Sequence, residues 1–316
     1  MSYRQITSEE RYMISSLHLQ GFSQAHIADQ IGRHRSTIWR EIKRNQCNDG
    51  CYRPSKAVTR TRSRRRESRR DYHFSDEQLQ MVFSLLRLNW SPEQISGWLR
   101  TNKILSISHA TIYRYIWYDW FYGGSLRTYL RQFSKRRRKK YRSADSRGVL
   151  PGKRHITERP AGAENRSRIG HWEIDTVMGA WDNHCIVTLV ERKSKYTIIG
   201  KLKARTTAEL NRRVISLIRK QDRPVITITA DNGTEFHQYE MIEQATDTTF
   251  YFATPYHSWE RGLNENTNGL IRQYLPKGKS MADLTQRMCD VIANKLNRRP
   301  RKTLDYKTPE QCYATI

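Results

Sequence analysis

The sequence contains no apolar run close to the roughly 18 residues that a membrane-spanning helix needs. Its first sixteen residues also lack a basic segment followed by an apolar core, so no secretory leader is predicted. Cysteine is scarce, and the five cysteines are odd in number and widely scattered, which fits a reducing cytoplasm. Cys47 and Cys51 are the nearest pair, but a zinc site would need a second regular pair of ligands, which the sequence does not contain.

Acidic side chains are also in short supply. The 316 residues hold 31 Asp and Glu against 57 Lys and Arg, which gives a formal net charge of +26. The excess is concentrated in the first 150 residues, where 30 basic residues face 12 acidic ones. A charge of this size predicts a polyanionic partner that is held mainly by the N-terminal half. A chain of this length is expected to form two or three domains.

The basic half begins with a helix-turn-helix pattern. Apolar residues recur at helical spacing in residues 8–20 and 23–32, and a glycine closes each segment. A third, basic helix is predicted over residues 33–45, with Ile38 and Ile42 facing inward. The last helix of such a motif enters the major groove of DNA. The residues predicted to contact DNA lie on its outer face: Arg35, Ser36, Thr37, Arg40 and Arg44.

A second unit of the same kind follows. Residues 75–88 are amphipathic, a helix start with proline in its first turn lies at residues 91–93, and residues 108–117 complete the unit. Its Thr-Ile-aromatic-Arg string matches the one in the first unit and makes Arg114 a further candidate DNA contact. Any three-helix bundle shows comparable spacing, and this unit is less basic, so pairing of subunits is an open alternative.

Two basic runs, residues 60–70 and 134–142, are predicted to be flexible linkers that add non-specific phosphate contacts. The predicted organisation therefore has five parts. They are a helix-turn-helix at residues 1–50, a basic linker at 51–74, a second helical domain at 75–133, a second linker at 134–165 and a final domain at 166–316.

The final part changes to short β-branched runs that alternate with helical segments. The expected order is three strands, a helix, a strand, a helix, a strand and a helix, which is a mixed α/β domain. The predicted strands are residues 170–177, 185–190, 196–202, 225–229 and 249–253, and the predicted helices are 208–220, 239–245 and 259–274. The fold class is thus multidomain, with all-α helix-turn-helix regions followed by an α/β domain that has a mixed central sheet.

Two aspartates stand at informative places in this domain. Asp175 lies within the first predicted strand, and Asp231 directly follows the fourth. If these strands are neighbours, the carboxylates meet at one end of the sheet, where α/β folds bind ligands. Their repulsion calls for a positive charge between them, and Mg²⁺ prefers such hard oxygen ligands. Asp231 before Asn-Gly would by itself be equally well explained as a turn former. Glu173 is expected on the opposite face of the strand from Asp175, and Glu235 is a weaker supporting acid.

Three strings, HWEIDTV, TADNGTEF and SWERGLNENTNGLIRQYLPKG, resemble the IS30 family of bacterial insertion-sequence transposases, and the resemblance covers nearly the whole chain. It implies an RNase H-like (integrase-type) fold whose DDE triad is Asp175, Asp231 and Glu265. The 33 residues between Asp231 and Glu265 resemble the spacing of that superfamily. Arg272, seven residues after Glu265, resembles the basic residue that follows the family's glutamate.

The resemblance also implies a function. The protein is expected to bind the terminal inverted repeats of an insertion sequence and to cut and join DNA strands with Mg²⁺, or Mn²⁺ as a substitute. Two ions about 3.5–4 Å apart would be held by the triad and would clamp the phosphoryl displacement. Arg261, Asn268 and Arg272 would contact DNA. The expected partners are double-stranded DNA and further copies of the chain, without a membrane or a nucleotide, at the nucleoid in the bacterial cytoplasm.

Two other functions are compatible with parts of this pattern. One is a non-catalytic DNA-binding regulator that retains an inert RNase H-like domain. The other is a structure-selective nuclease of the same fold, which would cut DNA without joining it. Intact acidic residues at all three triad positions favour the transposase.

Overall fold

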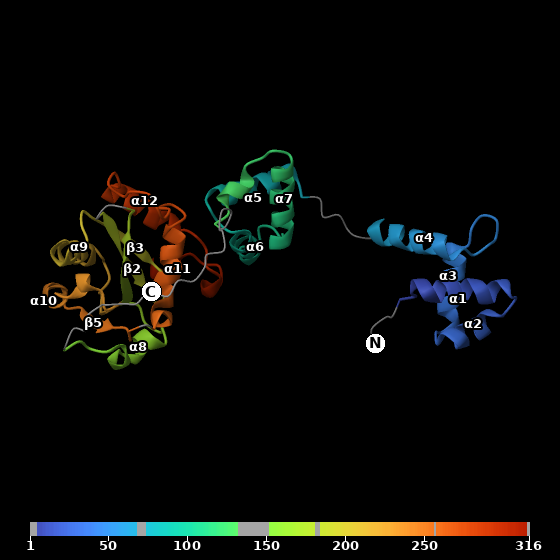
Figure 1. The fold of residues 1–316 in the computed structure, drawn as a ribbon, viewed down its shortest axis with the longest axis horizontal. Coiled ribbons are helices and arrows are strands. Elements are labelled where there is room, and N and C mark those ends of the chain that lie inside the picture. Colours follow the sequence, from blue (N-terminus) through green and yellow to red (C-terminus); the bar gives the residue numbers. More distant parts are fainter. Residues whose placement is uncertain (1–4, 68–73, 132–151, 181–183, 256, 315–316) are drawn as a thin grey trace. The chain divides into compact units, whose positions relative to one another are not determined.

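The structure, a computed structural model, describes residues 5–67, 74–131, 152–180, 184–255 and 257–314. The chain forms two compact units, residues 1–74 and 75–316, which are described separately (Figure 1). Within the described ranges, no helix combines the length and the apolar character needed to cross a membrane.

The first unit is helical. Its helices are α1 (Ser8–Leu19), α2 (Gln24–Ile31), α3 (Arg35–Asn45) and α4 (Pro54–Glu67). Thr7 caps α1 through a capping box, and Gly32 ends α2 in the left-handed conformation, at φ 67°. Ile14, Ile27 and Ile38 are fully buried between the helices. The three helices predicted for residues 8–45 are therefore confirmed, with Ile38 and Ile42 facing inward.

The prediction of a flexible linker at residues 60–70 is wrong for its first part, because α4 continues to Glu67. Arg60 donates hydrogen bonds to the carbonyl oxygens of Asn45 and Gln46, both at 2.9 Å. Arg64 donates to the carbonyl of Arg44 at 3.3 Å. These carbonyls belong to the end of α3, where helical partners are missing and the helix dipole attracts cations. The arginines therefore stabilise the first unit. Residues 68–70 and the run 134–142 lie outside the described residues.

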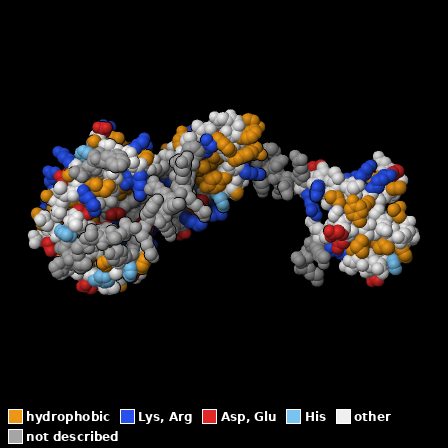
Figure 2. Space-filling view, in the orientation of Figure 1, with side chains coloured by type: hydrophobic (Ala, Val, Ile, Leu, Met, Phe, Trp, Pro, Cys, Tyr) orange, Lys and Arg blue, Asp and Glu red, His pale blue; other side chains and the backbone are white. Residues whose placement is uncertain are grey.

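The second unit begins with three further helices, α5 (Asp76–Arg87), α6 (Pro92–Thr101) and α7 (His109–Phe121), and a short turn η1 (Leu126–Tyr129). A serine caps each of the three helices, and the helix start predicted at residues 91–93 is confirmed. The outer side of α7 is aromatic: Trp117 and Phe121 are about half exposed and stack with ring centroids 5.5 Å apart. Figure 2 shows hydrophobic side chains gathered over these helices. This surface is less suited to phosphates than that of α3.

The rest of the second unit is built on a mixed five-stranded sheet in the order β3-β2-β1-β4-β5. The strands are β1 (His171–Met178), β2 (Cys185–Glu191), β3 (Thr197–Leu202), β4 (Thr227–Ala230) and β5 (Thr249–Phe252). β1, β2 and β3 pair antiparallel, whereas β1, β4 and β5 pair parallel. Glu173 is level with Thr229 in the β1–β4 register. Asp175 and Asp231, each two residues further on, therefore reach the same end of the sheet.

Helices cover both faces of this sheet (Figure 1). On one face α9 (Thr207–Arg219) and α10 (Glu240–Thr246) bury Ile174, Val187 and Leu189. On the other, α11 (Gly262–Ile271) and α12 (Gln286–Asn297) bury Val177 and Ile186. The predicted mixed α/β domain is confirmed. Short elements complete it: η2 (Ile156–Glu158), α8 (Ala161–Glu164), η3 (Thr234–Phe236), η4 (Ser258–Arg261), η5 (Lys302–Leu304) and α13 (Pro309–Ala314).

The α5–α7 helices and the α/β part contact each other within this unit. The side chain of Gln273 donates to Asn89 Oδ1 at 3.1 Å and to the carbonyl of Tyr129 at 3.3 Å. Lys302 and Glu93 form an exposed ion pair at 2.7 Å. The five-part division of the chain proposed above stays a prediction.

Candidate active site

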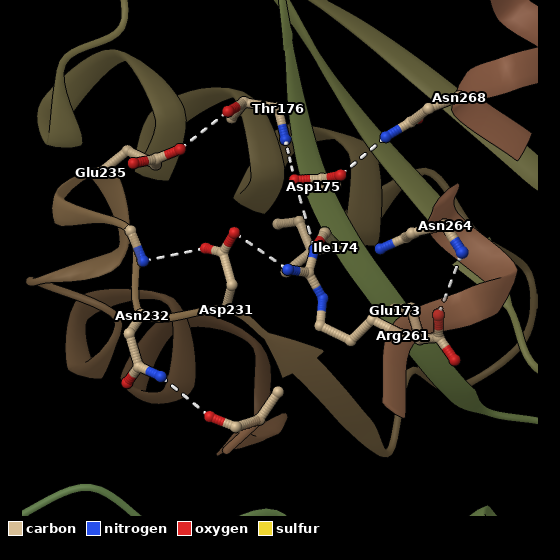
Figure 3. A network of polar contacts seen from close by, with 12 residues as sticks. Glu173, Ile174, Asp175, Thr176, Asp231, Asn232, Glu235, Arg261, Asn264 and Asn268 are labelled. Atoms are coloured by element: carbon tan, nitrogen blue, oxygen red, sulfur yellow. Dashed lines mark hydrogen bonds and ion pairs between the residues drawn. The ribbon is translucent and has the colours of Figure 1, made fainter. Parts of the chain in front are cut away.

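The end of the sheet carries two carboxylates that share one arginine (Figure 3). Arg261, the last residue of η4, places Nη2 3.2 Å from Asp175 Oδ1 and Nη1 3.0 Å from Asp231 Oδ2. Its Nη2 also donates to the carbonyl oxygen of Ile174 at 2.6 Å. Only 11% of the arginine side chain is exposed, against 25% and 30% for the two aspartates. One guanidinium thus occupies the position between the carboxylates where a cation was expected.

The electrostatics of the pair agree with this placement. Burial raises the pKa of Asp175; Arg261 offsets part of that effect, and Asp231 adds to it. Burial alone would lower the pKa of Arg261, but the charges of Asp175 and Asp231 outweigh it, so the pKa of the guanidinium is raised. Two carboxylates at one sheet end therefore require a positive partner, and here the chain supplies it.

Glu265 lies nearby but does not join the pair. It is exposed on α11 and lines an open cavity of about 710 Å³ together with Asp175, Arg261 and Arg272. Within the described residues, no three acidic, histidine or cysteine side chains are close enough to hold one ion together. The expected convergence of all three acids is therefore not seen in this arrangement. Without a cation between them three carboxylates repel one another, and the guanidinium compensates only two.

Two other predicted site residues hold the protein's own polar groups. Asn268 Nδ2 donates to Asp175 Oδ2 at 2.6 Å, and Asn268 Oδ1 accepts from Thr188 at 3.3 Å. Arg272 donates to the carbonyl oxygens of Met178, at 2.8 Å, and Leu275, at 3.3 Å. Asn268 thus orients one of the two carboxylates. DNA contacts by Asn268, Arg261 and Arg272 stay predictions.

The expectation for Glu173 is wrong. Residues two apart on a strand share a face, so Glu173 faces α11 together with Asp175. It is fully buried, forms an ion pair with the Arg192 guanidinium and accepts a hydrogen bond from the backbone N–H of Asn264 at 3.2 Å. Glu173 therefore ties the first turn of α11, one residue before Glu265, to β1. The two-residue alternation of side chains along a strand was the sequence signal for the face on which Glu173 lies.

Glu235 supports the same sheet end from η3. It is buried, is held by the Arg205 guanidinium at 2.7 Å and accepts a hydrogen bond from Thr176 Oγ1 at 2.7 Å. Because Thr176 follows Asp175, this contact fixes the backbone beside the carboxylate pair. Glu235 is an ion-paired support and is not free to act as a third acid.

The predicted DNA-contacting helix α3 presents Arg35, Arg40 and Arg44 to solvent. Ser36 and Thr37 are half-buried, and Ser36 bonds His34 Nδ1, which caps the helix. Arg64 and Arg65 of α4 line a cavity with Thr37, Arg40 and Arg44, so α4 widens the basic surface. Arg114 is exposed on α7, the helix that also carries the exposed Trp117 and Phe121.

Comparison with known proteins found similarities to the first helical unit and to the α/β part of the second unit. A family model described as a helix-turn-helix domain matches residues 2–45, and one described as an integrase core domain matches residues 165–258. The transposase for insertion sequence element IS4351 from Bacteroides fragilis is 41% identical, over 99% of this chain and 96% of its own length. Transposase InsI for insertion sequence element IS30A from Escherichia coli (strain K12) is 37% identical, over 90% and 77%. The transposase for IS1086 from Cupriavidus metallidurans is 34% identical, over 99% and 95%.

Proposed function

The chain belongs to the IS30 family of insertion-sequence transposases, and on that premise we propose that Asp175, Asp231 and Glu265 are its catalytic carboxylates. It is a DNA transposase whose integrase core carries out polynucleotidyl transfer and depends on a divalent metal. The observation that carries the assignment is the shared guanidinium: Asp175 and Asp231 meet at one sheet end and need a positive charge between them.

The residues fit a hard divalent cation. Carboxylate oxygens of Asp175, Asp231 and Glu265 are the ligands that Mg²⁺ prefers, and Mn²⁺ accepts the same donors. We propose two ions in each site; when bound, they supply the Lewis acidity that activates the attacking oxygen and stabilises the leaving one. Arg261 must then leave the space between the aspartates. It lies in η4, next to an open cavity, so the side chain has somewhere to go.

The remaining residues of the site position the carboxylates or supply positive charge for the phosphates of DNA. Asn268 holds one oxygen of Asp175, while Glu173 anchors the turn of α11 that carries Glu265. Arg272 and Lys277 line the same cavity as Glu265 and attract the phosphates of a bound strand. The outer face of α3 would hold the terminal repeats. Joining two element ends requires at least two sites, so a homodimer or larger assembly on DNA is part of the proposal.

The test compares cleavage with binding. Labelled duplexes that end in the terminal repeats are incubated with the full chain and Mg²⁺, and nicked and joined products are resolved on a denaturing gel. Asp231→Asn is expected to bind these duplexes normally but to cut at least about a hundredfold more slowly, because several kcal/mol of charge stabilisation are lost. Asp247→Asn is the matched control, since Asp247 is exposed and has a positive φ of 52° that asparagine tolerates.

Each outcome separates the candidate functions. Binding without nicking by the natural sequence would support the non-catalytic regulator, and cutting without joining would support a nuclease. Cleavage by Asp231→Asn at the rate of the control would remove Asp231 from the active site.

A further inference from the structure

A second cavity of the 75–316 unit carries a buried arginine, Arg299, for which the described residues provide no counter-ion. The cavity measures about 440 Å³, and its walls come from the α5–α7 helices on one side and from α11 and Arg299 on the other. Its walls include Trp90, Tyr113 and Tyr129. The transposase chemistry described above does not use it.

Arg299 is the unusual residue of this cavity. Its side chain is only 2% exposed, yet across the described residues no carboxylate forms an ion pair with it. Its Nη1 donates to Gln273 Oε1 at 3.2 Å and its Nη2 to the hydroxyl of Tyr274 at 2.7 Å, while Nε has no hydrogen-bond partner among the described residues. Burying a charge without a counter-ion is costly, so such an arginine is seldom retained for stability alone.

Two more arginines increase the local positive charge. Arg301 is bonded through Nη2 to the carbonyl of Leu296 at 3.2 Å, and its buried Nε also lacks a partner. Burial lowers the pKa of Arg301, and repulsion from Arg299 lowers it further. Arg131 is exposed at the cavity and repels both of them. Two guanidinium groups, those of Arg131 and Arg299, line the cavity, and that of Arg301 adds positive charge behind them. No described carboxylate is paired with them, so an anion would complete this site.

The other residues that line the cavity indicate which further groups the ligand carries. Trp90, Tyr113 and Tyr129 contribute aromatic rings, and Gln94 contributes an amide that can both donate and accept hydrogen bonds. Aromatic rings beside arginines are the features with which proteins hold unpaired bases and their phosphates. A cavity of about 440 Å³ is the size of a small-molecule site and has no room for a duplex.

This cavity also adjoins the candidate active site. Arg131 lines both this cavity and the cavity of about 710 Å³ that holds Asp175 and Glu265. The Arg131 guanidinium lies against Gly269 of α11, since a β-carbon built there would be 2.4 Å from Arg131 Nη2. The two cavities therefore meet at Arg131.

We propose that this cavity binds one unpaired nucleotide of the DNA that the transposase processes. Arg131 and Arg299 receive the phosphodiester group, and Trp90, Tyr113 and Tyr129 surround the base. This inference rests on the chain's action on DNA but not on the choice of the three catalytic carboxylates.

The test measures binding by the full chain without a divalent cation, so catalysis does not enter. Two duplexes of one sequence are compared, one blunt and one with unpaired nucleotides at its 3′ end, where 2-aminopurine reports stacking by loss of fluorescence. The natural sequence is expected to prefer the unpaired end at least about fivefold, as stacking of one base predicts. Tyr113→Ala should abolish the preference and the fluorescence loss. Tyr118→Ala, an exposed aromatic on the same helix that does not line the cavity, should keep both.

A second variant separates binding from structure. Arg299→Met removes an uncompensated buried charge, so its melting temperature should be unchanged or higher while the preference for the unpaired end falls. The dependence of log affinity on log salt concentration for that duplex should also become shallower by about 0.7, the share of one phosphate contact. Equal affinity of the natural sequence for both duplexes, or a Tyr113→Ala variant that keeps the preference, would overturn the proposal whatever happens to Arg299→Met.

Discussion

Replacing Arg261 by glutamine tests the electrostatic reading of the active site most directly. The change removes the charge that stands 3.2 Å from Asp175 and 3.0 Å from Asp231, and it keeps a polar side chain of moderate length. The two carboxylates are then left to repel each other. Without a divalent cation, the free energy of unfolding of residues 75–316 should therefore be lower in the Arg261→Gln variant than in the unsubstituted protein.

The size of the loss follows from burial. Removing one partner of a fully buried ion pair costs about 3–5 kcal/mol. Here the arginine is 11% exposed but the aspartates are 25% and 30% exposed, so water screens part of the repulsion. We expect a loss of about 2–3 kcal/mol, somewhat below that range because of this screening. Arg272→Gln is the matched control, because Arg272 lines the same cavity but bonds only backbone carbonyls.

Urea unfolding followed by tryptophan fluorescence measures the difference, since seven of the eight tryptophans lie beyond residue 74. Adding Mn²⁺ should stabilise Arg261→Gln more than the natural sequence, because the ion no longer competes with a resident guanidinium. Paramagnetic resonance of free Mn²⁺ gives the affinity independently. Unfolding at the same urea concentration as the natural sequence, with the same response to Mn²⁺, would refute the idea that Arg261 neutralises the pair.

Three further outcomes are expected. Glu173→Gln leaves Arg192 buried without its counter-ion and should lower the free energy of unfolding by about 3 kcal/mol in the same assay. Arg60→Ala removes two hydrogen bonds at the end of α3 and should destabilise the first unit by about 1–2 kcal/mol, measured by far-UV circular dichroism with exposed Arg62→Ala as control. Burial lowers the pKa of Lys195 from its ordinary 10.5 to about 8, so between these values the unfolded chain binds more protons and stability should rise with pH. Lys195→Asn, which suits the positive φ of 64°, should flatten that rise in a denaturation series across this range.

Local patterns in the sequence were sufficient for much of this protein. The cap at Ser91 and the closing glycine Gly32 located helix boundaries, because each acts on backbone groups within one turn. Strand alternation and the β-branched run before Asp231 located the sheet. The same alternation places Glu173 on the face of Asp175, because the two residues are two apart, whereas the prediction placed it on the opposite face.

What the sequence by itself determined is therefore the order of elements, the basic third helix of the first unit, and the placement of Asp175 within the first strand and of Asp231 directly after the fourth. The tertiary structure alone decided that Arg261 lies between those aspartates and that arginines of α4 bond the end of α3. It also decided that Arg299 is buried with no carboxylate of the described residues paired to it. These contacts join residues far apart in the chain. They depend on which surfaces pack together, and neither the period of a segment nor its charge specifies that packing.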